Sequence, residues 1–144
     1  MKKEVSERLN IFIQFLIFGI LLGLVENIIA IYFATEHSID ARAIMISFLV
    51  VIPFAAIGEL IVDKTYLLPK TKNIWMKHLE VFLEFLIFGV VMGVVEDLIV
   101  IGLVTGAPIT FEILWIVTIV TTPFAIIGEL IVDRFDWHMC KKLK

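Results

Sequence analysis

The chain has 144 residues, the size of a single domain, but 60% of them are hydrophobic, whereas soluble domains average about 45–50%. This composition argues against a soluble helical bundle, because too little polar surface is left to meet water. The formal net charge is −3 and no nucleic-acid-binding motif is present, so nucleic acid is not an expected partner. The lipid bilayer is the expected surrounding.

Four apolar stretches have close to the length of about 20 residues that crosses the hydrocarbon layer of a membrane. The linker between the second and third stretches is basic and contains Pro69, as a segment at the membrane surface would. The sequence therefore predicts an all-α membrane protein with four transmembrane helices, at residues 11–34, 43–62, 81–104 and 111–132.

The second half of the chain repeats the first at a constant offset of 70 residues. Residues 15–35 match residues 85–105 at 11 of 21 positions, and residues 52–63 match residues 122–133 at 10 of 12 positions. We therefore expect a tandem duplication of a two-helix hairpin. Because each repeat has an even number of spans, both copies enter the membrane in the same direction, which predicts a pseudo-twofold axis along the membrane normal. The two repeats are residues 1–70 and 71–144.

The basic residues are distributed unevenly about the predicted spans. Three lie before the first span, four between the second and third, and four after the last, and only Arg42 lies elsewhere. Cytoplasmic segments of membrane proteins carry an excess of Lys and Arg. The distribution predicts a multi-pass protein of the cell membrane with both termini in the cytoplasm.

The first span places Gly19, Gly23 and Glu26 at i, i+4 and i+7, so that all three share one helix face. A Gly-xxx-Gly pattern allows close helix packing in lipid, and it points the acid toward the packed side. Asn27 follows Glu26 on an adjacent face.

The third span repeats this pattern with Gly89, Gly93 and Glu96, and it has Asp97 where the first span has Asn27. We interpret the glycines as packing positions. The two glutamates are expected to bind an ion, while Asp97 is equally compatible with a hydrogen bond to a neighbouring helix.

The second and fourth spans each contain a proline, Pro53 or Pro123, and an acid near the inner end, Glu59 or Glu129. The prolines are expected to kink their helices, since each removes a backbone donor. At 1.5 Å per residue, Glu26 lies roughly 22 Å above the inner edge of its span and Glu59 about 6 Å above it. The acids should therefore form two layers. Span four adds three hydroxyl groups that are absent from the matching positions of span two, on Thr118, Thr121 and Thr122.

These acids have no basic partner within the spans. An ionised carboxylate near the membrane centre costs about 2.5–3.5 kcal/mol on insertion scales, so each must be protonated, face water or hold a cation. Oxygen ligands suit a hard divalent cation, which would be the cofactor or cargo, and they equally suit proton relay. Glu26 and Glu96 are the candidate metal ligands. The wider set of candidate cation- or proton-binding residues is Glu26, Asn27, Glu59, Glu96, Asp97 and Glu129.

Three functions fit this pattern. The first is a small transporter or channel that binds and moves a cation, as a homo-oligomer because four spans make a narrow pathway. The second is an accessory or structural protein whose acids serve packing between helices or with a membrane-protein partner. An intramembrane enzyme ranks last, because no nucleophile and no catalytic motif is present, and we expect no enzymatic activity.

Overall fold

The computed structural model describes the backbone of residues 2–35, 37–65 and 74–140, and the side chains of residues 12–35, 37–58 and 82–131. This part of the chain forms four helices, α1 Lys2–Thr35, α2 Ala41–Thr65, α3 Ile74–Thr105 and α4 Phe111–Cys140. Each helix contains a segment long and apolar enough to cross a membrane. These segments are Phe12–Thr35, Ala41–Gly58, Phe82–Thr105 and Phe111–Ile131. The prediction of four such helices is confirmed.

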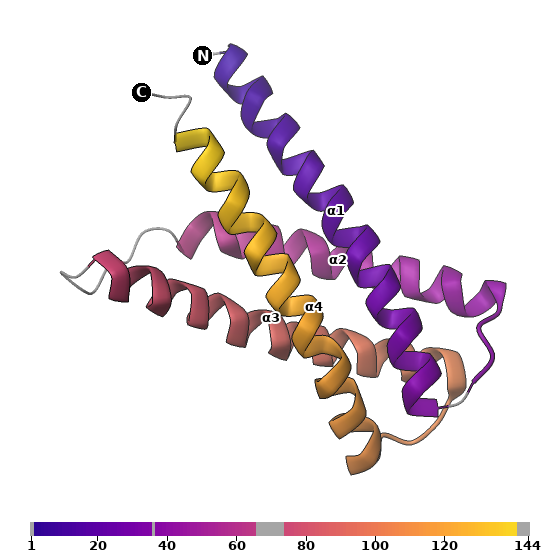
Figure 1. Cartoon of the computed structure of the whole chain (residues 1–144). Helices are drawn as coiled ribbons and strands as arrows, with labels where there is room; N and C mark the ends of the chain where they lie inside the picture. The colour runs from indigo at the N-terminus through magenta and orange to yellow at the C-terminus, as the bar shows by residue number, and fades with distance from the viewer. Residues whose placement is uncertain (1, 36, 66–73, 141–144) are drawn as a thin grey trace.

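The helices are arranged as two crossing pairs. In Figure 1, α1 runs beside α4, and this pair crosses α2 and α3, which also run side by side. Among the described residues α1 contacts all three other helices and so does α3, whereas α2 and α4 do not contact each other. The α1–α3 contact is therefore the centre of the bundle.

The two hairpins turn at the same end of the bundle (Figure 1). Polar side chains there satisfy the exposed helix termini. The Asp40 carboxylate accepts a hydrogen bond from the Ala43 backbone N–H (2.7 Å), which caps the start of α2 as an N-cap residue does. Thr110 caps α4 in the same way, since its hydroxyl oxygen accepts from the Ile113 N–H (3.3 Å). Gly106 follows the end of α3 with a positive φ of 65°, the left-handed conformation that favours glycine after a helix.

Both prolines lie inside continuous α-helix. Pro53 is within α2 and Pro123 within α4, and both side chains are exposed on the outside of the bundle. Neither proline interrupts its helix, although each leaves the carbonyl four residues earlier without its helical hydrogen bond. The predicted kinks stay a prediction.

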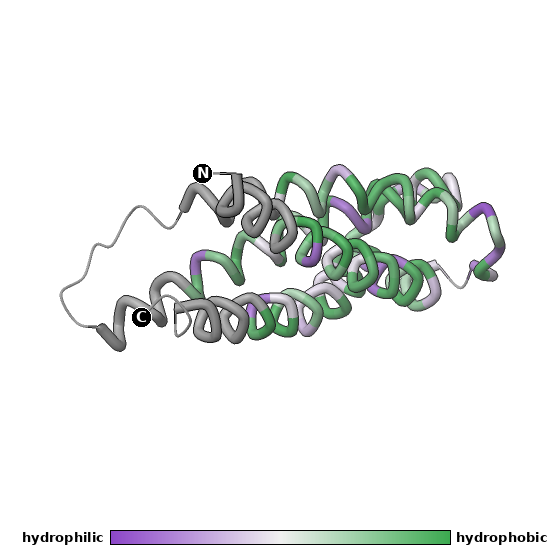
Figure 2. Tube along the Cα trace, turned by 90° about the horizontal axis from the view of Figure 1, so that it is seen from above, coloured by the Kyte–Doolittle hydropathy of each residue, from purple (hydrophilic) through white to green (hydrophobic). Residues whose placement is uncertain are grey.

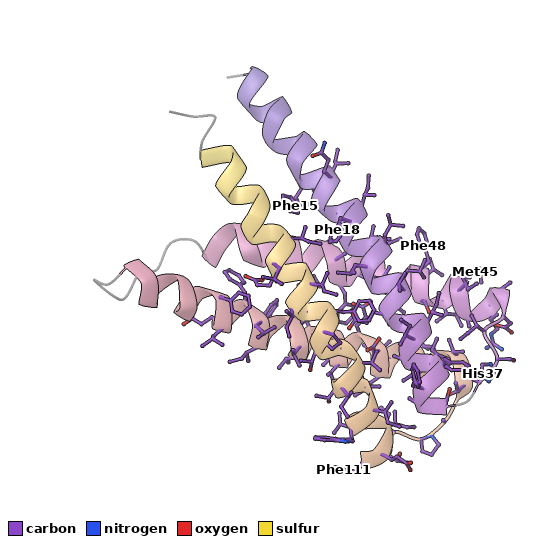
Figure 3. The ribbon with its side chains drawn as sticks, in the orientation of Figure 1. Phe15, Phe18, His37, Met45, Phe48 and Phe111 are labelled. Atoms are coloured by element: carbon purple, nitrogen blue, oxygen red, sulfur yellow. The ribbon has the colours of Figure 1, made fainter. Side chains whose placement is uncertain are left out.

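A small apolar core fills the end of the bundle near the hairpin turns. It consists of residues from all four helices: Ile31, Ala43, Val100, Ile101, Val104, Ile113 and Val117. The outer surface is also apolar, and Figure 2 shows hydrophobic residues along most of each described span. Met45 and Phe48, for example, point away from the other helices (Figure 3) and are exposed. A surface of this kind fits contact with lipid.

The core makes one prediction about stability. Ile101 is fully buried and Leu103, two residues away on α3, is 54% exposed. Because an exposed side chain already lies in lipid, only the buried site loses packing contacts on truncation. We expect Ile101→Ala to lower the free energy of unfolding by about 2 kcal/mol, the low end for a core Ile→Ala change. Equilibrium unfolding in detergent micelles would measure this, and an equal loss in Leu103→Ala would contradict the packing argument.

Candidate functional site

The polar residues at the α1–α3 contact form the centre of the candidate site. The side-chain amide of Asn27, on α1, donates a hydrogen bond from Nδ2 to Oε1 of Glu96 on α3 (2.8 Å). Asn27 is only 1% exposed, so it is more deeply buried than either glutamate. The structure therefore brings the Asn27 and Glu96 positions of the two repeats into direct contact.

A second hydrogen bond joins α3 to α4. The hydroxyl of Thr121 donates to Oδ2 of Asp97 (2.9 Å), and both residues are about 1% exposed. Asp97 thus points into the bundle rather than toward lipid. Buried polar groups of this kind are almost always hydrogen-bonded, and this pair meets that requirement for one oxygen of the carboxyl group.

Glycine on each central helix makes room for the acid on the other. A Cβ atom added at Gly93 would lie 3.0 Å from Oε1 of Glu26, and one added at Gly23 would lie 3.5 Å from Oε1 of Glu96. The side chains of α2 and α4 that face these glycines are closer still. The Gly93 Cβ would meet Thr121 Cγ2 at 2.5 Å, and the Gly23 Cβ would overlap Val51 Cγ2.

The other two glycines of the pattern face the neighbouring helix of their own hairpin. Gly19 lies opposite Ala55 on α2, and Gly89 lies opposite Ala125 on α4, with added Cβ atoms 3.6 and 3.5 Å from the alanine Cβ atoms. These are ordinary van der Waals distances. The tight positions are therefore Gly23 and Gly93, next to the acids.

Within the described side chains, three buried polar atoms have no hydrogen-bond partner. They are Oε1 of Glu26, Oδ1 of Asn27 and Oγ of Ser47 on α2. A buried polar group without a partner costs about 1–3 kcal/mol in proteins, so such atoms call for a water, a proton or an ion. All three are oxygens that can accept hydrogen bonds, and the serine hydroxyl can also donate one.

The inner layer of acids is described only in part. Glu59 belongs to the α2 backbone, but its side chain lies outside the described residues. Glu129 is half-buried on α4, eight residues after Thr121 and therefore about 12 Å further along the helix axis. Glu129 thus belongs to a different depth from the cluster around Asn27 and Asp97.

The described acids do not by themselves form a complete metal-binding site. Among the described side chains, no three His, Cys, Asp or Glu residues are grouped so that they could hold a metal ion. A divalent cation on Glu26 and Glu96 would need further oxygens, because hard cations take six or more ligands. That site stays a prediction.

Sequence patterns pointed to some of these residues and missed others. Thr121 stood out as a hydroxyl group absent from the matching position of the first repeat, where Val51 stands. Ser47 was missed, and its only signal is a hydroxyl group in an otherwise apolar stretch.

Comparison with known proteins gives no relative from which a function could be transferred. No protein-family model matches the chain, and neither a curated protein nor a solved structure shows a significant match. The function therefore has to follow from the chemistry of the site.

Proposed function

We propose that this protein is a small integral membrane protein that binds and moves a cation, either a proton or a divalent metal ion, through its intramembrane carboxyl groups. The observation that carries the proposal is the buried cluster of Glu26, Asn27, Glu96 and Asp97, in which two oxygens lack a partner. No Lys, Arg or His occurs at residues 12–35 or 82–105 to neutralise these acids. Ionisable residues within membrane spans usually mark an ion pathway.

The chemistry of the cluster favours a cation. Ionised carboxylates only accept hydrogen bonds, and the described donors in the cluster are the Asn27 amide and the Thr121 hydroxyl. Three acids next to two donors leave an excess of negative charge in a medium of low dielectric constant. A bound proton or metal ion would offset this cost.

The wider architecture belongs to the same proposal. We place both termini in the cytoplasm of the cell, because the basic residues flank the inner ends of the spans. The two repeats would be related by a pseudo-twofold axis through the α1–α3 contact. Glu59 and Glu129 would line the inner mouth of the pathway, and a homo-oligomer would enclose a wider route than four helices can.

Cation flux into proteoliposomes tests the function. Protons, monovalent ions and divalent metals would be screened with the unmodified chain and with the double variant Glu26→Gln/Glu96→Gln. Glutamine preserves shape but cannot carry a proton or a negative charge, so we expect flux to fall to the level of empty liposomes. Glu112→Gln is the matched control, because Glu112 is an exposed acid in the first turn of α4 and its loss should leave flux unchanged.

One observation favours a second candidate, a structural or accessory membrane protein. The Asn27–Glu96 and Thr121–Asp97 hydrogen bonds each link two helices, and such bonds contribute about 1–2 kcal/mol at best in membranes. If the folded protein carried no ion and the Gln variants behaved like the unmodified chain, the acids would serve packing. Constant co-purification with one membrane protein would then identify the partner.

A further inference from the structure

The two halves of the polar cluster differ at the residue after each glutamate. In one half, Asn27 donates its amide N–H to Glu96. The residue 70 positions later is Asp97, which stands next to Glu96 on α3 and has no N–H to offer Glu26. The exchange of Asn for Asp therefore removes the donor that Glu26 would receive if the two repeats were identical. Oε1 of Glu26 is accordingly buried without a partner.

Among the described residues, the Thr121 hydroxyl is the one other donor close to Glu26. The described charged groups near Glu26 are Asp97 and Glu96, both acids on α3. Oε1 of Glu26 and Cγ2 of Thr121 both lie against Gly93, and Thr121 is hydrogen-bonded to Asp97. Thr121 on α4 is close to both carboxyl groups, but its single hydroxyl hydrogen is donated to Asp97. The carboxyl groups of Glu26 and Asp97 are thus two hydrogen-bond acceptors that lie next to a single donor, the Thr121 hydroxyl.

Ionisable groups on the flanking helices do not change this balance. The only ionisable side chain described on α2 is Arg42, which is exposed at the hairpin end. The described acids of α4 are Glu112, exposed near the same end, and the half-buried Glu129 at a different depth. A positive charge must therefore come from outside the described protein groups.

Asn27, on the other side of the α1–α3 contact, independently indicates that a hydrogen-bond donor is missing from the cluster. Asn27 is 1% exposed, its nitrogen is bound to Glu96, and its carbonyl oxygen Oδ1 has no partner. An amide oxygen buried within an acid cluster accepts a hydrogen from a protonated acid or a water. The two unpartnered oxygens, on neighbouring residues of α1, both require a hydrogen-bond donor.

We propose that Glu26 and Asp97 form an acid pair that binds a single proton, and that Glu96 is its inert counterpart, fixed by Asn27. The inference also identifies the transported ion as a proton, and in this respect it rests on the proposed function. Two carboxylates close together in a medium of low dielectric constant repel strongly. One proton replaces the repulsion by a charge-assisted O–H···O hydrogen bond, which is among the strong ones.

A divalent metal ion fits the Glu26–Asp97 pair less well than a proton does. Hard cations require six or more oxygen ligands, while Oδ2 of Asp97 and Oε1 of Glu96 already accept hydrogen bonds from Thr121 and Asn27. The described acids also form no group of three that could hold a metal. A proton needs only the two carboxyl groups.

Labelling with dicyclohexylcarbodiimide tests the pair without measuring transport. This apolar reagent adds to a protonated carboxyl group within a membrane, the carboxyl proton moving to a reagent nitrogen, so that one whole reagent molecule is gained and nothing is released. Peptide mass spectrometry of the full chain in liposomes would locate the adduct. We expect it on the Glu26–Asp97 pair, with Glu96 labelled about tenfold less, the factor expected for one hydrogen bond to a charged group.

The substitution Asp97→Asn is the decisive variant. Its amide nitrogen would donate to Glu26 as Asn27 does to Glu96, and its amide oxygen would still accept from Thr121. We expect a folded protein, checked by circular dichroism and unfolding in micelles, in which Glu26 labelling falls about tenfold. Glu112→Gln is the control and should label like the unmodified chain.

The outcomes separate this inference from the proposed function. Equal labelling of Glu26 and Glu96, or unchanged labelling of Glu26 in folded Asp97→Asn, would overturn the acid pair even if a metal flux were found. Selective labelling of the pair without any flux would support the proton site and would instead contradict transport.

Discussion

Gly93→Leu is expected to prevent the four helices from packing in their present arrangement. A single Cβ atom at this position would lie 2.5 Å from Thr121 Cγ2 and 3.0 Å from Oε1 of Glu26. Thr121 is β-branched and hydrogen-bonded to Asp97, so its methyl group cannot rotate away without breaking that bond. The clash therefore has to be relieved by moving α3 away from α4 and α1.

The expected loss is large because helix association in lipid depends on close packing. We expect Gly93→Ala to lower the free energy of unfolding by about 1–3 kcal/mol, the range for overpacked cores, and Gly93→Leu to exceed it. Equilibrium unfolding in mixed micelles would measure both.

Gly102→Leu is the matched control for this experiment. Gly102 lies on the same helix, but a Cβ atom there would meet nothing within 4 Å. Its replacement should be neutral or mildly stabilising, because glycine inside a helix costs about 1 kcal/mol relative to alanine. Equal destabilisation by Gly93→Leu and Gly102→Leu would contradict the close contact at Gly93.

The helices were predictable because hydropathy and span length determine them nearly alone. The structure has four apolar helices whose candidate spans agree with the predicted ones within a few residues, and the side chains of residues 59–62 of the second predicted span lie outside the described residues. The repeat and the membrane orientation stay predictions from the sequence.

The residues that meet at the α1–α3 contact were predictable only in part. The glycine face predicts that the two glutamates point toward a helix contact, but the fully buried members are Asn27 and Asp97, the second of which the helical spacing assigns to an adjacent face. Successive residues on a helix differ in direction by about 100°. Which of two neighbours is buried therefore depends on how α1 and α3 cross, and the sequence of either helix alone does not contain this angle.

Asn27→Asp, which gives the first repeat the residue of the second, is expected to be the most damaging change in the polar cluster. It removes the amide hydrogen bond to Glu96 and places a fourth carboxyl group among three. Leaving a buried charge without its partner costs about 3–5 kcal/mol in proteins. We expect a loss of this size in the free energy of unfolding at neutral pH.

The loss should shrink as the pH falls. A protonated aspartic acid at position 27 can donate an O–H to Glu96 as the amide does, so proton binding both removes the added charge and restores the hydrogen bond. Unfolding in micelles would therefore be compared between neutral and acidic buffer. The difference between Asn27→Asp and the unmodified chain should decrease toward acid pH.

Gln14→Glu is the control, because it also converts a residue of the first repeat to its counterpart in the second. Glu84 stands 70 residues after Gln14, and both side chains are exposed, so this added carboxyl group should change the free energy of unfolding little at either pH. If Asn27→Asp were as harmless as Gln14→Glu, the Asn27–Glu96 hydrogen bond would contribute nothing to the α1–α3 contact. A loss that did not depend on pH would instead show that the shape of the asparagine, and not its ability to donate a hydrogen bond, is what the contact requires.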